Sequence, residues 1–323
     1  MGSGIGQSSR FERSHPLGRP LAEAELQAIM KDTLVTGQAW GAFNRDRVTR
    51  GKSMELEVLG VGNAFTSRYY NTSFLIRSRE LVLLDCPQAL FRLLRERRVD
   101  PGSINRVIIT HIHGDHTSGL ETLLLWKRWV ARTRLAVYTT RRVWDELKER
   151  FFPGFSATFA PDLERIVETQ LEDYADFSEL KEDQENPIAD GLKVDFRYNW
   201  HPTPTLGLKL ISPDGVVGIS GDTCYRPTLL RRLLEHGVID ANRYEKLAGD
   251  WLWQSDVIYH EVERGEAGAH TSEADLLSLP AEMRRKIRLI HLADDFEDSE
   301  LPLAREGERV NFTAGGEVQI SLP

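Results

Sequence analysis

Metal-binding side chains crowd one turn of this sequence. In VIITHIHGDHTSG, which spans residues 107–119, His111, His113, Asp115 and His116 fall within six positions. Imidazole nitrogens with a carboxylate suit a borderline cation such as zinc, and manganese or iron would accept the same donors. A polar turn after a strand is the alternative, but the chain has nine histidines and places three of them here. The spacing therefore predicts a metal site.

Further ligands must come from distant parts of the chain, because one turn cannot complete two metal shells. Strand ends present side chains to a shared cleft, so polar residues at the ends of apolar runs are the candidates. The residues with this placement are His201, Asp222, His260 and His291. His15 and His236 lack such a context, and we expect them at the surface.

Composition bounds the class of protein. The 323 residues are 41% hydrophobic and 28% charged, which describes an ordinary soluble protein of one large or two modest domains. Cys86 and Cys224 are too few for a disulfide framework. No run approaches the roughly 18 apolar residues of a membrane span, and the first residues lack an apolar signal core. We therefore expect a cytoplasmic protein that does not contact membranes.

The negative charge is concentrated in one segment. Residues 163–190 hold ten acids and two bases, which equals the net charge of −8 of the whole chain. We interpret this segment as an acidic insertion, made of a solvated helix and a linker. Like charges repel a polyanion, so long nucleic acid is not favoured as a partner.

Hydrophobic patterns predict strands in groups, separated by helices, after an N-terminal extension. The extension covers residues 1–53 and contains a helix at 21–35, and the main domain covers 54–323. Strands are expected at 54–62, 72–78, 80–86, 105–110, 135–140, 192–200, 205–212, 215–220, 256–260 and 287–292, with a closing pair at 308–312 and 316–322. Helices are expected at 88–99, 119–134, 141–152, 226–237 and 272–286. This order indicates an α/β layered fold with mixed sheets rather than a parallel barrel.

Together these residues resemble the metallo-β-lactamase fold superfamily. The resemblance covers about residues 54–321 and rests on HIHGDH, the later GDT and histidines, and the opening LGVGNAFTSRYYNTSFLI with LLDC. Within that opening, the usual positions of the superfamily's sequence pattern are occupied by Gly60, Gly62, Asn71 and Ser73. The resemblance implies an αββα sandwich with two mixed β-sheets and a dinuclear metal site at one edge.

The same resemblance implies how the ligands divide between two divalent ions, zinc first and manganese or iron as alternatives. The first ion would be held by His111, His113 and His201, the second by Asp115, His116 and His291, with Asp222 bridging both. Two ions about 3.5–4 Å apart can activate a shared water and clamp the oxygens of the attacked centre. We expect a metal-bridging hydroxide, which Asp115 could also orient. Asp85 and Thr110 would fix ring orientation, although Asp85 could equally make only a strand-end hydrogen bond.

Fold alone does not select the reaction, because this superfamily holds thioesterases, lactonases, lactamases and nucleases. The segments HPTPTLGLKL (201–210) and YHEVERGEAGAHTSEADL (259–276) are similar to those of ribonuclease Z-like proteins. That similarity implies a histidine that protonates a poor alkoxide leaving group. We expect His260 in this role, with Glu261 or Glu263 as its partner, and His270 as the substitute. The alternative is that His260 merely packs at a strand end.

The sequence also departs from ribonuclease Z. HEVE stands where HEAT is usual, and the acidic block stands where a basic RNA-clasping arm would lie. A small phosphodiester such as a cyclic nucleotide needs no arm, and cyclic-nucleotide-degrading relatives, including the anti-Pycsar type, are similar in this respect. The most favoured function is therefore a dinuclear metal-dependent phosphodiesterase acting on a cyclic nucleotide. The alternatives are an RNA 3′-end endonuclease, a carboxyl-ester, lactone or thioester hydrolase, and a metal-stabilised binding protein.

Two expectations remain. Four aromatic residues either stack on a base or pack in the core or at an interface, and they are Tyr69, Tyr70, Trp251 and Trp253. A homodimer is expected by analogy with proteins of the ribonuclease Z type.

Overall fold

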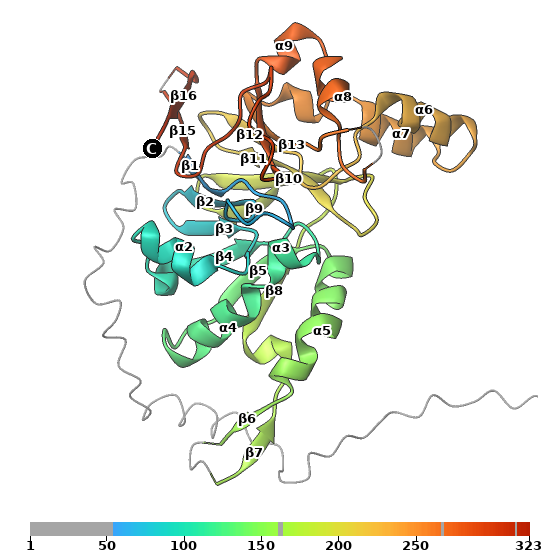
Figure 1. The fold of residues 1–323 in the computed structure, drawn as a ribbon. Helices are drawn as coiled ribbons and strands as arrows, with labels where there is room; N and C mark the ends of the chain where they lie inside the picture. Colours follow the sequence, from blue (N-terminus) through green and yellow to red (C-terminus); the bar gives the residue numbers. More distant parts are fainter. Residues whose placement is uncertain (1–53, 161–163, 266–267, 314) are drawn as a thin grey trace, which may run out of the picture.

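The computed structural model describes residues 54–160, 164–265, 268–313 and 315–323 (Figure 1). The predicted N-terminal extension, with its helix at 21–35, lies outside the described residues. Within the described ranges, no helix has the length and hydropathy needed to cross a lipid bilayer.

Two mixed β-sheets form the centre of the described chain. One has eight strands in the order β16-β15-β1-β2-β3-β4-β5-β8, and the other has six in the order β14-β13-β12-β11-β10-β9. The strands of the first sheet are β1 (Glu55–Gly60), β2 (Ser73–Arg77), β3 (Leu81–Leu84), β4 (Ile104–Ile108), β5 (Leu135–Thr139), β8 (Ala175–Glu179), β15 (Arg309–Phe312) and β16 (Val318–Ser321). Those of the second are β9 (Asn186–Ala189), β10 (Leu192–Tyr198), β11 (Leu206–Ile211), β12 (Val216–Ile219), β13 (Val257–Glu261) and β14 (Ile287–Ile290). A separate hairpin pairs β6 (Ala157–Phe159) with β7 (Ile166–Glu168).

Helices cover the outer faces of both sheets, which confirms the expected αββα sandwich (Figure 1). Those on the eight-stranded sheet are α2 (Leu90–Glu96), α4 (Leu120–Trp129) and α5 (Arg141–Phe155). Those on the side of the six-stranded sheet are α6 (Pro227–Glu235), α7 (Ala241–Ala248), α8 (Glu273–Leu277) and α9 (Ala281–Arg284). The remaining helical turns are α3 (Gly114–Thr117), η1 (Pro101–Ser103), η2 (Leu171–Asp173) and η3 (Leu252–Gln254).

Central strands are apolar on both faces because each face meets a different core. In β2, Phe74 and Ile76 point into the core between the sheets, whereas Leu75 points toward the helices. In β4, Ile108 faces the inter-sheet core and Val107 faces the helices. This explains why these strands read as continuous apolar runs in the sequence.

Parallel pairing gathers the polar strand ends at one edge. Strands β3, β4, β5 and β8 run parallel to one another, as do β12, β13 and β14. Their carboxyl ends therefore meet at the same edge of the sandwich, and the residues that follow them are candidates for a shared site.

The acidic segment differs from its prediction as a solvated helix and linker. Its described part forms β7, η2, β8 and β9, so it contributes one strand to each sheet. Leu171 and Tyr174 are buried, and the Tyr174 ring lies 4.5 Å from that of Phe155. The carboxylates pair with cations of other segments, for example Glu172 with Lys148. The density of acidic residues obscured the strand pattern in the sequence. Cations that neutralise several of these acids, such as Lys148, lie far from them along the chain.

Candidate metal centre

The first group of ligand atoms joins the turn after β4 to two other strand ends. Its members are His111, His113, His201 and Asp222, whose ligand atoms all lie within 4.8 Å of one another. The His201 Nε2 atom lies 3.3 Å from His113 Nδ1, and His111 Nε2 lies 3.5 Å from Asp222 Oδ2. Imidazole nitrogens converge in this way when a cation can sit between them.

A second group shares Asp222 with the first. It consists of Asp115, His116, Asp222 and His291. The Nε2 atom of His116 lies 3.2 Å from Asp115 Oδ2 and 3.4 Å from Asp222 Oδ1. His291 Nε2 lies 3.4 Å from Asp115 Oδ2 and 3.6 Å from Asp222 Oδ2. One carboxylate thus faces both groups, so the seven residues that the sequence singled out as ligands form one continuous centre.

The donor set fits a metal ion because buried nitrogens are left without hydrogen bonds. Among the described residues, His111 Nε2 and His116 Nε2 are buried and have no hydrogen-bond partner. Leaving a buried polar atom unsatisfied is costly, so such atoms call for a partner. Both nitrogens face carboxylates of the centre, and a divalent cation would satisfy all of these groups together.

Asp85 and Thr110 hold two of the imidazole rings from behind. Asp85 Oδ2 lies 2.7 Å from His116 Nδ1, and the Thr110 hydroxyl donates to the same oxygen at 2.8 Å. The Thr110 Oγ1 atom also lies 3.0 Å from Nδ1 of His111. These contacts fix the rings with their Nε2 atoms toward the centre, which supports the orienting role over a simple strand-end hydrogen bond.

Two of the five non-glycine residues with positive φ in the described chain lie at this centre. Asp85 has a φ of 59° and His291 a φ of 60°, both in the left-handed region that non-glycine residues rarely adopt. Such strain persists only where the surroundings hold it, and it clusters at functional sites. Here it aims an orienting carboxylate and an imidazole into one edge of the sandwich.

Electrostatics prepare the centre for a cation. Burial lowers the pKa of His111 well below its ordinary value, and burial lowers that of His201 to about 4, so these rings are neutral donors. Burial also disfavours charge on His116, but Asp222 and Asp85 outweigh it and raise its pKa. Burial acts to raise the pKa of Asp222, yet His291 and His116 pull it well below the usual carboxyl range. The carboxylates are thus ionised and draw positive charge.

A third group lies beside the centre and involves the residues predicted for proton transfer. Glu261 Oε2 lies 2.8 Å from His270 Nδ1 and 3.9 Å from His291 Nδ1, while Glu261 Oε1 accepts from the Thr271 N–H at 2.8 Å. The ring of His270 is 4.7 Å from that of His291 and 5.6 Å from that of His201. Burial alone would lower the pKa of His270, but the adjacent Glu261 carboxylate raises it to about 9.

His260 does not join these groups, contrary to the preferred expectation for the proton donor. Its side chain is 1% exposed, its Nδ1 lies 2.7 Å from the Glu261 carbonyl oxygen, and its ring stacks on Trp253 at 5.5 Å and 6°. Successive residues of a strand point to opposite faces, so Glu261 faces the centre and His260 faces away. This placement matches the alternative in which His260 packs at a strand end.

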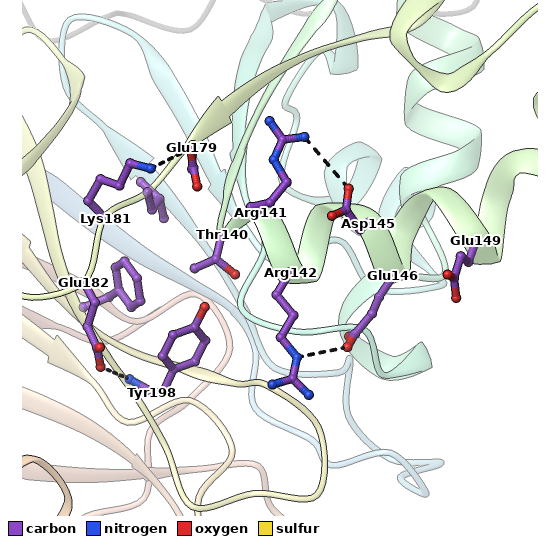
Figure 2. A pocket seen from close by; sticks show the side chains of 12 residues that line it. Thr140, Arg141, Arg142, Asp145, Glu146, Glu149, Glu179, Lys181, Glu182 and Tyr198 are labelled. Atoms are coloured by element: carbon purple, nitrogen blue, oxygen red, sulfur yellow. Dashed lines mark hydrogen bonds and ion pairs between the residues drawn. The ribbon is translucent and has the colours of Figure 1, made fainter. Parts of the chain in front are cut away.

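A groove of about 570 Å³ lies between α5, the segment that follows β8 and the end of β10, and none of the seven ligand residues lines it (Figure 2). Thr140 lines it and continues β5, the neighbour of β4, which leads into His111. Its cations point to carboxylates of the same walls, as Figure 2 shows for Arg141 with Asp145 and for Arg142 with Glu146. The lining residues include five acids and three bases, so the groove does not attract a phosphate backbone.

The four aromatic residues considered for base stacking are held by the protein itself. Trp253 supports His260, and the Trp251 Nε1–H donates to Asp195 at 2.8 Å. Tyr70 donates its hydroxyl to Glu96 at 2.8 Å, and Tyr69 packs against the inter-sheet core. These contacts favour the packing role for all four.

Comparisons with known proteins agree with this geometry. The family model for the Anti-Pycsar protein Apyc1 matches residues 54–318. The Anti-Pycsar protein Apyc1 of Paenibacillus sp. (strain J14) is 30% identical over 248 residues, which are 76% of this chain and 91% of that protein. The cAMP/cGMP-dependent 3′,5′-cAMP/cGMP phosphodiesterase B of Dictyostelium discoideum is 28% identical over 254 residues, 76% of this chain but 22% of that protein.

Among solved structures, the metallo-beta-lactamase fold protein YhfI from Bacillus subtilis superposes with a TM-score of 0.58 and 16% identity. The match covers 80% of this chain and 99% of that one. Likeness at this identity concerns the fold alone, and it confirms the metallo-β-lactamase fold expected from the sequence.

Proposed function

Because the chain belongs to the Anti-Pycsar protein Apyc1 family, we propose that it is a metal-dependent phosphodiesterase that hydrolyses a cyclic mononucleotide. The observation that carries the proposal is the pair of ligand groups that share Asp222, with the Glu261–His270 pair directly beside them. Phosphodiester hydrolysis needs both parts, since the phosphoryl group must be activated and the leaving alkoxide must receive a proton.

The proposed ligands are the seven residues of the two groups, with Asp222 shared. Imidazole and carboxylate donors at these positions suit two zinc ions, with manganese or iron as alternatives. When bound, the ions would polarise the phosphoryl oxygens and lower the pKa of the attacking water. Asp115 faces the same space through its Oδ2 atom and would orient that water.

Proton transfer is assigned to His270. Glu261 holds the Nδ1 of this ring at 2.8 Å, which leaves Nε2 to donate to the leaving 3′ or 5′ oxygen of the ribose. The Glu261 carboxylate raises the pKa of this ring, which favours the protonated form that an acid catalyst requires. His260 would instead support the strand that carries Glu261, through its packing on Trp253.

A small substrate suits the surroundings better than a long one. The groove between α5 and the segment that follows β8 carries more acids than bases, and the acidic segment adds β8 to the sheet whose β4 leads into His111. A long polyanion would be repelled there, whereas a cyclic nucleotide carries a single phosphate that the cations of the centre would attract. We therefore place cyclic nucleotides ahead of RNA 3′ ends, and a homodimeric, cytoplasmic enzyme remains part of the proposal.

A substrate panel tests this function. Metal-loaded protein should hydrolyse at least one 3′,5′-cyclic nucleotide to a nucleoside monophosphate, with little action on a lactone, a thioester or a 3′-extended RNA. Preferential hydrolysis of the lactone or thioester would instead establish the carboxyl-ester alternative. Preferential cleavage of the RNA would establish the endonuclease alternative.

A further inference from the structure

Phe65 is exposed to an unusual degree for a large apolar side chain. Its exposed fraction is 93%, whereas the next most exposed phenylalanine of the described chain, Phe159, reaches 59%. Single apolar side chains on a surface are common and need no explanation by themselves. What distinguishes Phe65 is the construction of the loop that carries it.

The loop around Phe65 is fastened by one carboxylate. Asp294 accepts hydrogen bonds from the Thr66 hydroxyl at 2.6 Å, from the Ser67 N–H at 2.9 Å and hydroxyl at 2.6 Å, and from the Arg68 N–H at 3.1 Å. The Phe65 N–H itself donates to the Asn63 side chain at 3.0 Å. The backbone is therefore held in place while the phenyl ring points into solvent.

The same loop borders the metal centre. The Asn63 N–H donates to the Leu292 carbonyl at 3.0 Å, and Leu292 directly follows the ligand His291. Consecutive Cα atoms are about 3.8 Å apart, so the Cα of Phe65 lies within about 7.6 Å of that of Asn63. A Cβ at Gly62 would come within 2.4 Å of Thr66 Cγ2, so glycine is what lets the loop fold back here.

We infer that Phe65 is the surface on which the nucleobase of the substrate stacks. The inference rests on the proposed cyclic-nucleotide phosphodiesterase function and names a specificity residue for it. With the phosphate held by the ligand groups, the ribose would carry the base outward to the rim of the centre, where the phenyl ring on this fastened backbone can meet its face. Stacking is tolerant of base identity but stronger for larger bases, so purine nucleotides should profit most.

Kinetics on substrates with and without a nucleobase test the inference. Phe65→Ala should raise KM for cyclic AMP and cyclic GMP by about fivefold or more, a loss typical of one base–aromatic stack. KM for the base-free 3′,5′-cyclic phosphate of 1-O-methylribose should not change. Phe65→Trp should restore the wild-type KM. Phe159→Ala is the matched control, because its strand β6 projects away from both sheets (Figure 1), and it should leave both substrates unaffected.

Three results would overturn the inference. One is an unchanged KM for the cyclic nucleotides in Phe65→Ala, and another is an equal rise for the base-free substrate. The third is a dimer that dissociates in Phe65→Ala during analytical ultracentrifugation, which would make the ring an interface residue. Failure of the proposed function is a separate result, since the wild-type protein would then hydrolyse no cyclic nucleotide.

Discussion

At the scale of single residues, His260 and Glu261 show that a shift of one position along a strand changes the role of a side chain. They are neighbours on β13, yet the carboxylate reaches His270 while the imidazole is buried against Trp253. Successive residues of a strand face opposite sides of the sheet. With Asp222 and His291 assigned to the centre, this alternation could have identified Glu261, rather than His260, as the residue that faces it. That His270 returns to meet Glu261 could not be read from the sequence, because it depends on the path of the loop between them.

If His270 donates the proton, its removal should affect a substrate with a poor leaving group more than one with a good leaving group. His270→Gln should lower kcat for a cyclic nucleotide by about 10²- to 10⁴-fold, because the alkoxide leaves poorly without a proton. For bis-p-nitrophenyl phosphate the loss should be much smaller, since p-nitrophenolate is a good leaving group. Steady-state kinetics with both substrates measure the difference.

His260→Gln is the matched control for that experiment. It removes a ring stacked on Trp253, so the melting temperature should fall while kcat for the cyclic nucleotide is largely retained. If His260→Gln lost as much kcat as His270→Gln and still melted like the wild type, the assignment of the proton donor would be wrong.

At the scale of elements, the end of β3 holds the centre in shape. Asp85→Asn keeps a side chain that tolerates the φ of 59° but removes the charge that faces His116. The affinity for zinc should fall by about 10- to 100-fold, as for other groups that orient metal-bound histidines. Titration against a chromophoric chelator measures this, with the exposed Asp176→Asn on β8 as the control. Equal affinities for Asp85→Asn and wild type would contradict the orienting role.

Elements were predictable where their pattern was local. The turn after β4 could be read because a β-branched run ends directly at clustered ligands. Strands β8 and β9 could not, because acids of this segment pair with distant cations: Asp176 of β8 pairs with Arg134, and Glu182, between the two strands, meets Lys246 across 64 positions. Charge that looks solvated in the sequence is neutralised only once the sheets assemble.

At the scale of the whole molecule, a buried lysine links stability to pH. Lys127 donates to the Gly102 carbonyl at 3.0 Å and to Asn105 Oδ1 at 2.9 Å. Burial lowers the pKa of Lys127 to about 8, and the charge of Asp100 offsets this only in part. The folded chain therefore releases this proton near pH 8, whereas the unfolded chain keeps it until about pH 10.5.

Between these pH values the unfolded state binds more protons, so this group makes the free energy of unfolding rise with pH. The increase is at most about 1.4 kcal/mol per pH unit, and it should be absent in Lys127→Met. Urea unfolding of metal-stripped protein from pH 7 to 10.5 measures it, with the exposed Lys193→Met as the control. If the free energy of unfolding changed with pH in the same way in wild type and Lys127→Met, burial would not shift the pKa of this lysine.

The central claim is that the two groups sharing Asp222 bind the metal ions that hydrolysis requires. The direct measurement adds zinc or manganese in steps to chelator-stripped protein while hydrolysis of a cyclic nucleotide is followed. We predict no turnover without metal and a rate that rises until about two equivalents are bound per chain. Full turnover in the stripped protein, or metal binding at this stoichiometry without any turnover, would contradict the account.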